Sequence, residues 1–160
     1  SMERSKRRYP TFAQLMAMTT SDGETGTFLA THETFDGIRT MFRENRVIPV
    51  VGDFCGEKAI RAIGDDLRTR SLELGVFYTS NVEQYLFQAK CYDQFVSNVE
   101  SLPTNGSSLF VRVWFDQGRR HPLQKRGHRT TTVTMPISTF MERWSKGRYR
   151  SYWRVATDRP

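Results

Sequence analysis

The fold prediction starts from residues 47–58, which read VIPVVGDFCGEK. The first five residues are nearly all apolar, as expected for a strand that is buried on both faces of a parallel sheet. Gly52 and Asp53 end this run, and apolar residues then recur at helical spacing over residues 56–70. Pro49 fits only the start or the edge of such a strand, because proline has no N–H to donate to a ladder. The segment therefore predicts a strand, a turn and a helix in succession.

A second apolar run, Leu74–Thr79, follows that helix and predicts a second strand. With one helix between them, the two strands form a βαβ unit, whose strands run parallel with a right-handed crossover. Alternating apolar residues over 109–115 and β-branched residues over 130–134 predict two further strands. Helical spacing recurs in five other segments: 12–16, 31–42, 82–87, 92–99 and 137–144. We therefore predict an α/β fold with a partly parallel sheet of about four strands and flanking helices.

The composition favours one globular, cytoplasmic domain. Hydrophobic residues make up 38% and aromatic residues 12% of the 160 residues, which is enough to build a core. No apolar run is long enough to cross a bilayer, so we expect no membrane partner. Cys55 and Cys91 lack zinc-ligand spacing, and we expect neither a metal site nor a disulfide framework, which fits a reducing compartment. We predict a single α/β domain over residues 9–160 after a flexible basic lead at residues 1–8.

The positive charge of the chain lies mainly near its C-terminus. The net charge is +7, but residues 119–160 hold eleven Lys or Arg against two acids, a balance of +9. Basic residues beside an aromatic side chain such as Trp114 bind phosphates and stack on bases. A solvated charged face explains the same pattern equally well. The candidate surface for nucleic acid or anions comprises Arg119, Arg120, Lys125, Arg126 and Arg129.

Polar side chains follow both strands of the predicted βαβ unit. Gly52 and Gly56 let the backbone turn tightly or approach a ligand, and a helix that begins nearby offers N–H groups to an anion. Ligands of open α/β sheets bind at the carboxyl ends of parallel strands. In the alternative interpretation the glycines only form a turn and Asp53 caps the helix. The predicted ligand-binding residues are Gly52, Asp53, Gly56, Lys58, Ser80, Asn81, Glu83 and Tyr85, with Asp53 and Glu83 as polar anchors and Asn81 and Tyr85 orienting the ligand.

Several of these motifs also resemble a known family. They are Val47–Asp53 with Gly56 and Ala62-Ile63-Gly64, Phe77–Glu83, Tyr9-Pro10-Thr11, His121-Pro122 and Gly147–Trp153. Together they resemble an uncharacterised bacterial family related to class I S-adenosylmethionine-dependent methyltransferases. The resemblance runs from about Tyr9 to Asp158 and covers the C-terminal half of the usual family member. It implies a three-layer Rossmann-like fold.

The same resemblance implies a methyltransferase-like domain that is not an autonomous methyltransferase, because the donor-binding half has no equivalent here. S-adenosylmethionine is then the implied cofactor only where another chain completes its site, and no catalytic residue is assigned. A truncated sheet also exposes an edge, which a second copy or a partner chain could cover.

Three functions stay open on the sequence. The first is binding of a small or anionic ligand at the carboxyl ends of the two strands. The second is nucleic-acid binding through the basic C-terminal surface, and the third is an oligomerisation or scaffold domain.

Overall fold

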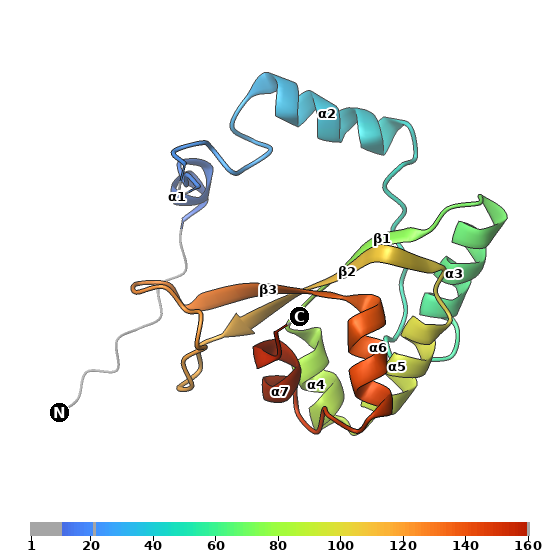
Figure 1. The fold of residues 1–160 in the computed structure, drawn as a ribbon. Coiled ribbons are helices and arrows are strands. Elements are labelled where there is room, and N and C mark those ends of the chain that lie inside the picture. The colour runs from blue at the N-terminus through green and yellow to red at the C-terminus, as the bar shows by residue number, and fades with distance from the viewer. Residues whose placement is uncertain (1–10, 21, 160) are drawn as a thin grey trace. The chain divides into compact units, whose positions relative to one another are not determined.

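The computed structural model of the chain describes residues 11–20 and 22–159, so the basic lead predicted at residues 1–8 lies outside the described part. The chain divides into two compact units, Ser1–Pro49 and Val50–Pro160. The first unit contains two of the described helices, and the second contains the sheet and the other described helices (Figure 1). The single domain predicted over residues 9–160 stays a prediction. Within the described residues, no helix combines the length and the apolar character needed to cross a bilayer.

The first unit contains helices α1 (Phe12–Met16) and α2 (His32–Arg43), in two of the segments where helical spacing predicted them. Local capping holds both helices. Thr11 and Gln14 form a capping box at α1, and the Thr31 side chain accepts a hydrogen bond from the Thr34 N–H at α2. None of the described residues up to Pro49 is buried. Caps, rather than a core of its own, therefore define the helices of this unit.

The second unit is built on a sheet of three strands, β1 (Leu74–Ser80), β2 (Thr104–Phe115) and β3 (Thr130–Pro136). The order is β1-β2-β3; β1 runs parallel to β2, and β2 runs antiparallel to β3. The sheet is partly parallel, as predicted, but it has three strands in the described part of the chain where about four were predicted. The missing strand is the first one.

The segment Val47–Val51 is irregular, so its assignment as a buried parallel strand is wrong. Val51 is fully exposed and Val50 is 51% exposed. The hydrogen bonds found among the described residues include no backbone bond from residues 47–51, and Pro49 has no N–H to give. An apolar run that lacks a neighbouring strand has no ladder to join. The parallel partner of β1 is β2 instead.

The crossover between the two parallel strands therefore differs from the predicted one. It consists of α4 (Val82–Gln88) and α5 (Tyr92–Glu100), which connect β1 to β2. The predicted helix over residues 56–70 exists as α3 (Ala59–Thr69), but it connects the irregular segment to β1 and packs on α5.

The helices of the second unit pack on one face of its sheet, and the three-layer Rossmann-like arrangement stays a prediction. Side chains of α4, α5, α6 (Ile137–Ser145) and α7 (Tyr152–Thr157) all contact the sheet face that carries Phe77, Phe110 and Arg112 (Figure 1). On the opposite face, Val76 and Tyr78 of β1 are 56% and 61% exposed. Alternate residues of β1 thus point to a packed side and to an open side.

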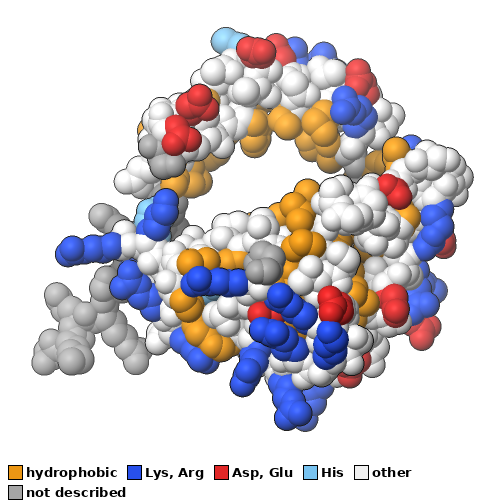
Figure 2. Space-filling view, viewed as in Figure 1, with side chains coloured by type: hydrophobic (Ala, Val, Ile, Leu, Met, Phe, Trp, Pro, Cys, Tyr) orange, Lys and Arg blue, Asp and Glu red, His pale blue; other side chains and the backbone are white. Residues whose placement is uncertain are grey.

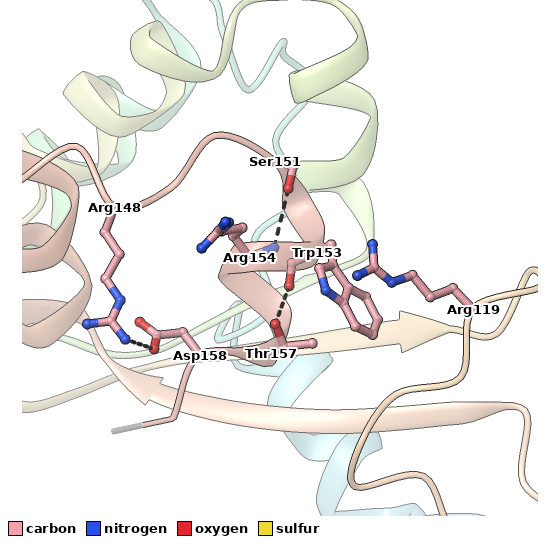
Figure 3. A pocket seen from close by; sticks show the side chains of 7 residues that line it. All are labelled: Arg119, Arg148, Ser151, Trp153, Arg154, Thr157 and Asp158. Carbon is pink, nitrogen blue, oxygen red and sulfur yellow. Dashed lines mark hydrogen bonds and ion pairs between the residues drawn. The ribbon is translucent and has the colours of Figure 1, made fainter.

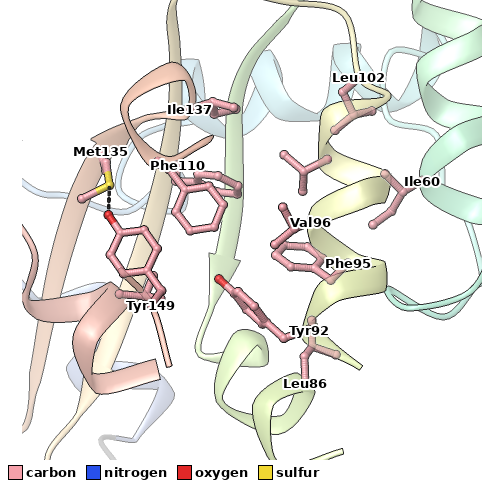
Figure 4. Close-up of a cluster of buried hydrophobic side chains, with 13 residues drawn as sticks. Ile60, Leu86, Tyr92, Phe95, Val96, Leu102, Phe110, Met135, Ile137 and Tyr149 are labelled. Atoms are coloured by element: carbon pink, nitrogen blue, oxygen red, sulfur yellow. Dashed lines mark hydrogen bonds between the residues drawn. The ribbon is translucent and has the colours of Figure 1, made fainter. Parts of the chain in front are cut away.

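The core of this unit combines aliphatic side chains with a group of aromatic rings that pack against the sheet (Figure 4). Phe77 stacks on Phe110 with ring centroids 5.6 Å apart, and Phe140 of α6 meets Phe110 edge-on at 5.2 Å. Phe95 of α5 lies 6.0 Å from Phe77. Such pairs add roughly 0.5–1.5 kcal/mol each beyond the area they bury. These rings fix α5 and α6 against the sheet.

The two cysteines form a disulfide, which corrects the expectation that they stay unpaired. Cys55, in the turn before α3, is bonded to Cys91 at the start of α5. The turn lies against α5 because the Asn98 side chain donates to the carbonyls of Phe54 (3.0 Å) and Gly56 (2.8 Å). The 36-residue sequence separation hid this proximity. The cysteine content therefore no longer supports a reducing compartment.

Candidate functional site

Half of the predicted ligand-binding residues lie together. Gly52, Asp53, Gly56 and Lys58 line a hollow of about 590 Å³ whose other walls are Val50, Val51, Glu57, Ala59 and Ala62. A side chain at Gly52 would not fit, because its Cβ would lie 2.1 Å from the Cβ of Ala59. One carboxylate oxygen of Asp53 accepts the Cys55 N–H at 2.9 Å and so closes the turn, while Lys58 is the N-cap of α3. Asp53 is thus a turn residue and not the cap of the helix.

The buried amide of Asn98 holds this turn in place, a role that the sequence analysis missed. Besides its two bonds to the turn carbonyls, its oxygen accepts the Nε–H of Arg61 at 2.9 Å. Asn98 is 2% exposed, so each polar atom of its side chain needs a partner within the protein. An Asn within the apolar helix pattern of residues 92–99 was the only available signal.

The other predicted ligand-binding residues lie elsewhere. Ser80, Asn81, Glu83 and Tyr85 do not line the hollow around Gly52. Asn81 is the N-cap of α4 without a side-chain cap bond, the carbonyl of Ser80 accepts the Tyr152 hydroxyl at 3.0 Å, and Tyr85 is exposed. The predicted crevice between two adjacent parallel strand ends does not form, because the segment before Gly52 is not a strand. Ligand binding by the individual residues stays a prediction.

Glu83 is enclosed in a charged cluster beneath the sheet. Its side chain is 0% exposed and forms an ion pair with Arg112 of β2, Nε to Oε1, at 2.7 Å. The hydroxyls of Thr79 and Tyr92 donate to its two oxygens at 2.7 Å and 2.5 Å. A carboxylate with these three partners is fully engaged and inaccessible to solvent. Glu83 therefore stabilises the fold through these three contacts, and its predicted role as a ligand anchor stays a prediction.

Arg112 completes this cluster. Its guanidinium carbon lies 3.9 Å from the ring centroid of Phe110 and 4.8 Å from that of Phe140. Burial lowers the pKa of Arg112, but the charge of Glu83 outweighs it and raises the pKa above its ordinary value. Burial, and then the charge of Glu83, raise the pKa of Tyr92 well above its ordinary value. The cluster thus holds a charged pair beside a neutral tyrosine.

The basic surface predicted from the sequence lies in the segment between β2 and β3. Arg119, Arg120, Lys125, Arg126 and Arg129 are all exposed. None of them forms an ion pair with a carboxylate in the part of the chain that the structure describes. Figure 2 shows Lys and Arg side chains gathered over α7 and its neighbours. The positive charge predicted from the sequence is therefore available at the surface.

One of these residues, Arg119, lines a second hollow of about 460 Å³ (Figure 3). The remaining lining residues come from the C-terminal segment: Arg148, Ser151, Trp153, Arg154, Thr157 and Asp158. The Arg119 guanidinium lies over the Trp153 ring, 3.6 Å from its centroid. The sequence could not indicate that Trp153 and Arg154 line a hollow with Arg119, because these residues are far apart along the chain and Trp153 resembles an ordinary packing residue.

The only acid of this hollow is already neutralised. Asp158 accepts hydrogen bonds from Arg143 (2.9 Å), Arg148 (2.9 Å) and the Tyr149 hydroxyl (2.6 Å). Burial raises the pKa of Asp158, but these hydrogen bonds and the two arginine charges prevail and lower it below its ordinary value. Burial and then the hydrogen bond to Asp158 raise the pKa of Tyr149 to about 12. Arg119 and Arg154 are left without a carboxylate partner among the described residues.

Comparison with protein families gives one match. Residues 3–159 match the family model described as a domain of unknown function, DUF7790. The chain belongs to the DUF7790 family. None of the curated proteins matches the sequence. The DUF7790 match runs through both compact units and includes the two hollows, while its description assigns no activity to either.

Proposed function

We propose that this DUF7790 domain binds nucleic acid through the phosphates, on the basic surface between β2 and α7. The observation that carries the proposal is the hollow in which Arg119 and Arg154 face a shared space without carboxylate partners. Arginine is suited to this task, because its planar guanidinium donates two parallel hydrogen bonds to a phosphate. A hollow that gathers such donors favours an anion over a neutral ligand.

The other exposed cations of the β2–β3 segment extend the proposed binding surface. Lys125, Arg126 and Arg129 are exposed in the segment that follows Arg119, so several phosphates of one strand can be neutralised together. Each neutralised phosphate releases counterions, which makes the affinity fall steeply with salt. A small anion that fills only the hollow lacks this dependence on the neighbouring cations.

The experiment is fluorescence anisotropy with labelled single-stranded and duplex oligonucleotides between 50 and 200 mM salt, a range in which about six or more phosphate contacts lower the affinity by about 10³-fold. The four-residue variant Arg119/Arg120/Lys125/Arg126→Ala should lose binding. The matched control, Arg43/Arg46/Arg70/Lys90→Ala, removes as many positive charges elsewhere and should retain most of it. Binding that is absent in the natural chain, independent of salt or equally reduced by both variants contradicts the proposal.

A second candidate function is ligand binding in the hollow around Gly52, which the resemblance to methyltransferase-like, Rossmann-like proteins favours. Four predicted residues line that hollow, and one carboxylate oxygen of Asp53 has no hydrogen-bond partner among the described residues. That oxygen could accept hydrogen bonds from hydroxyl groups of a nucleoside. Calorimetry with S-adenosylmethionine and with S-adenosylhomocysteine tests it, with Asp53→Asn as the variant expected to weaken binding. No heat with either compound removes the donor site from this chain.

A further inference from the structure

We propose that the hollow beside Trp153 is a seat, that is, a binding site for one backbone phosphate of the nucleic acid. The residues of this site contact the phosphate and not the base. The inference rests on the proposed function and specifies which chemical group of the nucleic acid is recognised there. It assigns Arg119 and Arg154 as the phosphate ligands, Ser151 as a hydroxyl donor, and Trp153 as the platform that positions Arg119.

Arg119 is held at both of its ends. Its backbone carbonyl accepts the indole N–H of Trp114 at 2.8 Å, and its guanidinium lies over the Trp153 ring. A guanidinium stacked on a ring keeps its N–H groups free in its own plane. Because the side chain is already ordered, binding a phosphate loses little conformational entropy. This arrangement is typical of a prepared binding group.

The Trp153 ring itself is occupied, which argues against base stacking. Arg119 covers a face of the ring, Trp114 meets it edge-on with centroids 4.7 Å apart, and His121 meets it edge-on at 6.2 Å. Trp114, which the sequence suggested as a stacking residue, packs against Tyr152 with centroids 5.6 Å apart. Base-stacking sites present an open aromatic face to the strand. The aromatic residues here support the arginine instead.

His121 helps to hold the Trp153 ring in place. Its Nδ1 accepts the Leu123 N–H at 3.1 Å, so Nε2 carries the proton and donates it to the Ala156 carbonyl at 2.9 Å. The imidazole is 3% exposed and joins the β2–β3 segment to α7. Arg119 and Trp153 therefore come from two segments that are tied together directly behind the hollow.

Some of the polar side chains that line the hollow already donate to acceptors within the protein, and others have donors left for a ligand. Thr157 donates its hydroxyl to the Trp153 carbonyl at 2.7 Å, and Arg148 is paired with Asp158 at 2.9 Å. Ser151 accepts the Arg154 N–H at 3.4 Å, and its own O–H has no acceptor among the described residues, so it is available to donate. Two guanidinium groups and one hydroxyl are thus available to a phosphate.

The binding test compares three probes by competition against a labelled oligothymidylate: the unlabelled strand, an abasic strand of equal length, and inorganic pyrophosphate. We expect the abasic strand to compete within about 3-fold of the natural strand, because the seat contacts no base. Pyrophosphate should compete weakly and only at millimolar concentration, because it cannot reach the neighbouring cations. If the abasic strand fails to compete, the inference is overturned and the site recognises the base. If pyrophosphate competes as strongly as the strand, the inference is overturned and the hollow binds a free anion.

Single replacements locate the seat. Arg119→Gln and Arg154→Gln should each weaken oligonucleotide binding about 10-fold and reduce the salt slope by about one phosphate contact. Trp153→Leu should weaken binding, whereas Trp153→Phe should restore most of it. The control is Arg150→Gln, which removes an exposed arginine outside the hollow. If the chain binds nucleic acid but Arg119→Gln and Arg154→Gln match this control, the seat is wrong while the proposed function stands; if the natural chain does not bind, both fail.

Discussion

Arg112 differs from Arg119 and Arg154 of the same unit in its exposure and in its carboxylate partner. Arg112 is 1% exposed, paired with Glu83 and enclosed by aromatic rings, whereas Arg119 and Arg154 face a hollow with no carboxylate partner among the described residues. The first arrangement satisfies a charge within the protein, and the second leaves charges available to another molecule. The comparison teaches that the partners of an arginine, and not its presence in a basic sequence, decide whether it serves the fold or a ligand.

The largest effect is expected from breaking the buried pair. Glu83→Gln leaves the Arg112 charge without its counterion beneath the sheet, and the free energy of unfolding should fall by about 3–5 kcal/mol. Urea unfolding monitored by circular dichroism measures the change. Replacing both partners, Glu83→Leu with Arg112→Met, should recover part of the loss, because no unpaired charge remains although the buried Thr79 and Tyr92 hydroxyls lose their acceptor. A loss below about 1 kcal/mol for Glu83→Gln means that water reaches the cluster.

The next largest effect is expected from removing the disulfide, which lies next to Tyr92 of the Glu83–Arg112 cluster. Cys91 precedes Tyr92, whose hydroxyl donates to Glu83, so the crosslink fixes the start of α5 at that point. Closing a loop of 36 residues stabilises the fold by about 3–4 kcal/mol in the chain-entropy model. The double variant Cys55→Ser/Cys91→Ser should lose that amount in urea unfolding, and dithiothreitol should destabilise the natural chain but not the variant. Equal stability of both proteins contradicts the crosslink.

A smaller effect is expected at alkaline pH from the hydroxyl next to the basic hollow. The pKa of Tyr149 is raised to about 12, first by burial and then by Asp158, while the unfolded chain titrates near the ordinary value of about 10. A raised pKa stabilises the fold fully below about pH 10, and this contribution is lost as the pH rises toward about 12. Unfolding curves across this range should show a smaller decline for Tyr149→Phe than for the natural chain. Identical declines assign the loss to Tyr92 and Tyr152, whose pKa values are also raised.

The smallest effect on stability is expected from the available arginines. Arg119→Gln and Arg154→Gln should each change the free energy of unfolding by no more than about 1 kcal/mol, because neither side chain has a carboxylate partner among the described residues and the stacking of Arg119 on Trp153 contributes roughly 0.5–1 kcal/mol. The same urea measurement checks this. A loss of 2 kcal/mol or more, by rough comparison with buried hydrogen-bonded sites, would assign these residues to the fold as well.

The sequence predicted most elements because their periodicity is local. Strand β1 and helices α3 to α6 lie where apolar spacing predicted them. Val47–Val51 was wrong because an apolar run becomes a strand only when a neighbouring strand is available, and none adjoins it. The apolar composition of a segment does not show whether a neighbouring strand is available to pair with it. Pro49, which has no N–H to donate to a ladder, was the feature of the segment that argued against a strand.

The prediction of site residues was weaker, because side chains that contact one another in the fold lie far apart along the chain. Glu83 looked like a ligand anchor next to Ser80 and Asn81, yet its ion-pair partner lies 29 residues further on. The basic residues of the β2–β3 segment are exposed and their binding role stays a prediction, whereas the hollow depends on Trp153 and Arg154 from the C-terminal helix. Charge can be counted from a sequence; the contacts that neutralise it or leave it free depend on the tertiary fold.

Five exposed cations, Arg119, Arg120, Lys125, Arg126 and Arg129, lie in the connection between β2 and β3 rather than on the strands themselves. Surface connections tolerate substitution and insertion, because few packed side chains depend on them. Lysines and arginines can therefore be gained or lost there while the aromatic core and the Glu83–Arg112 pair stay unchanged. Among members of one family, the attraction for polyanions can in this way diverge widely on a scaffold of nearly constant stability.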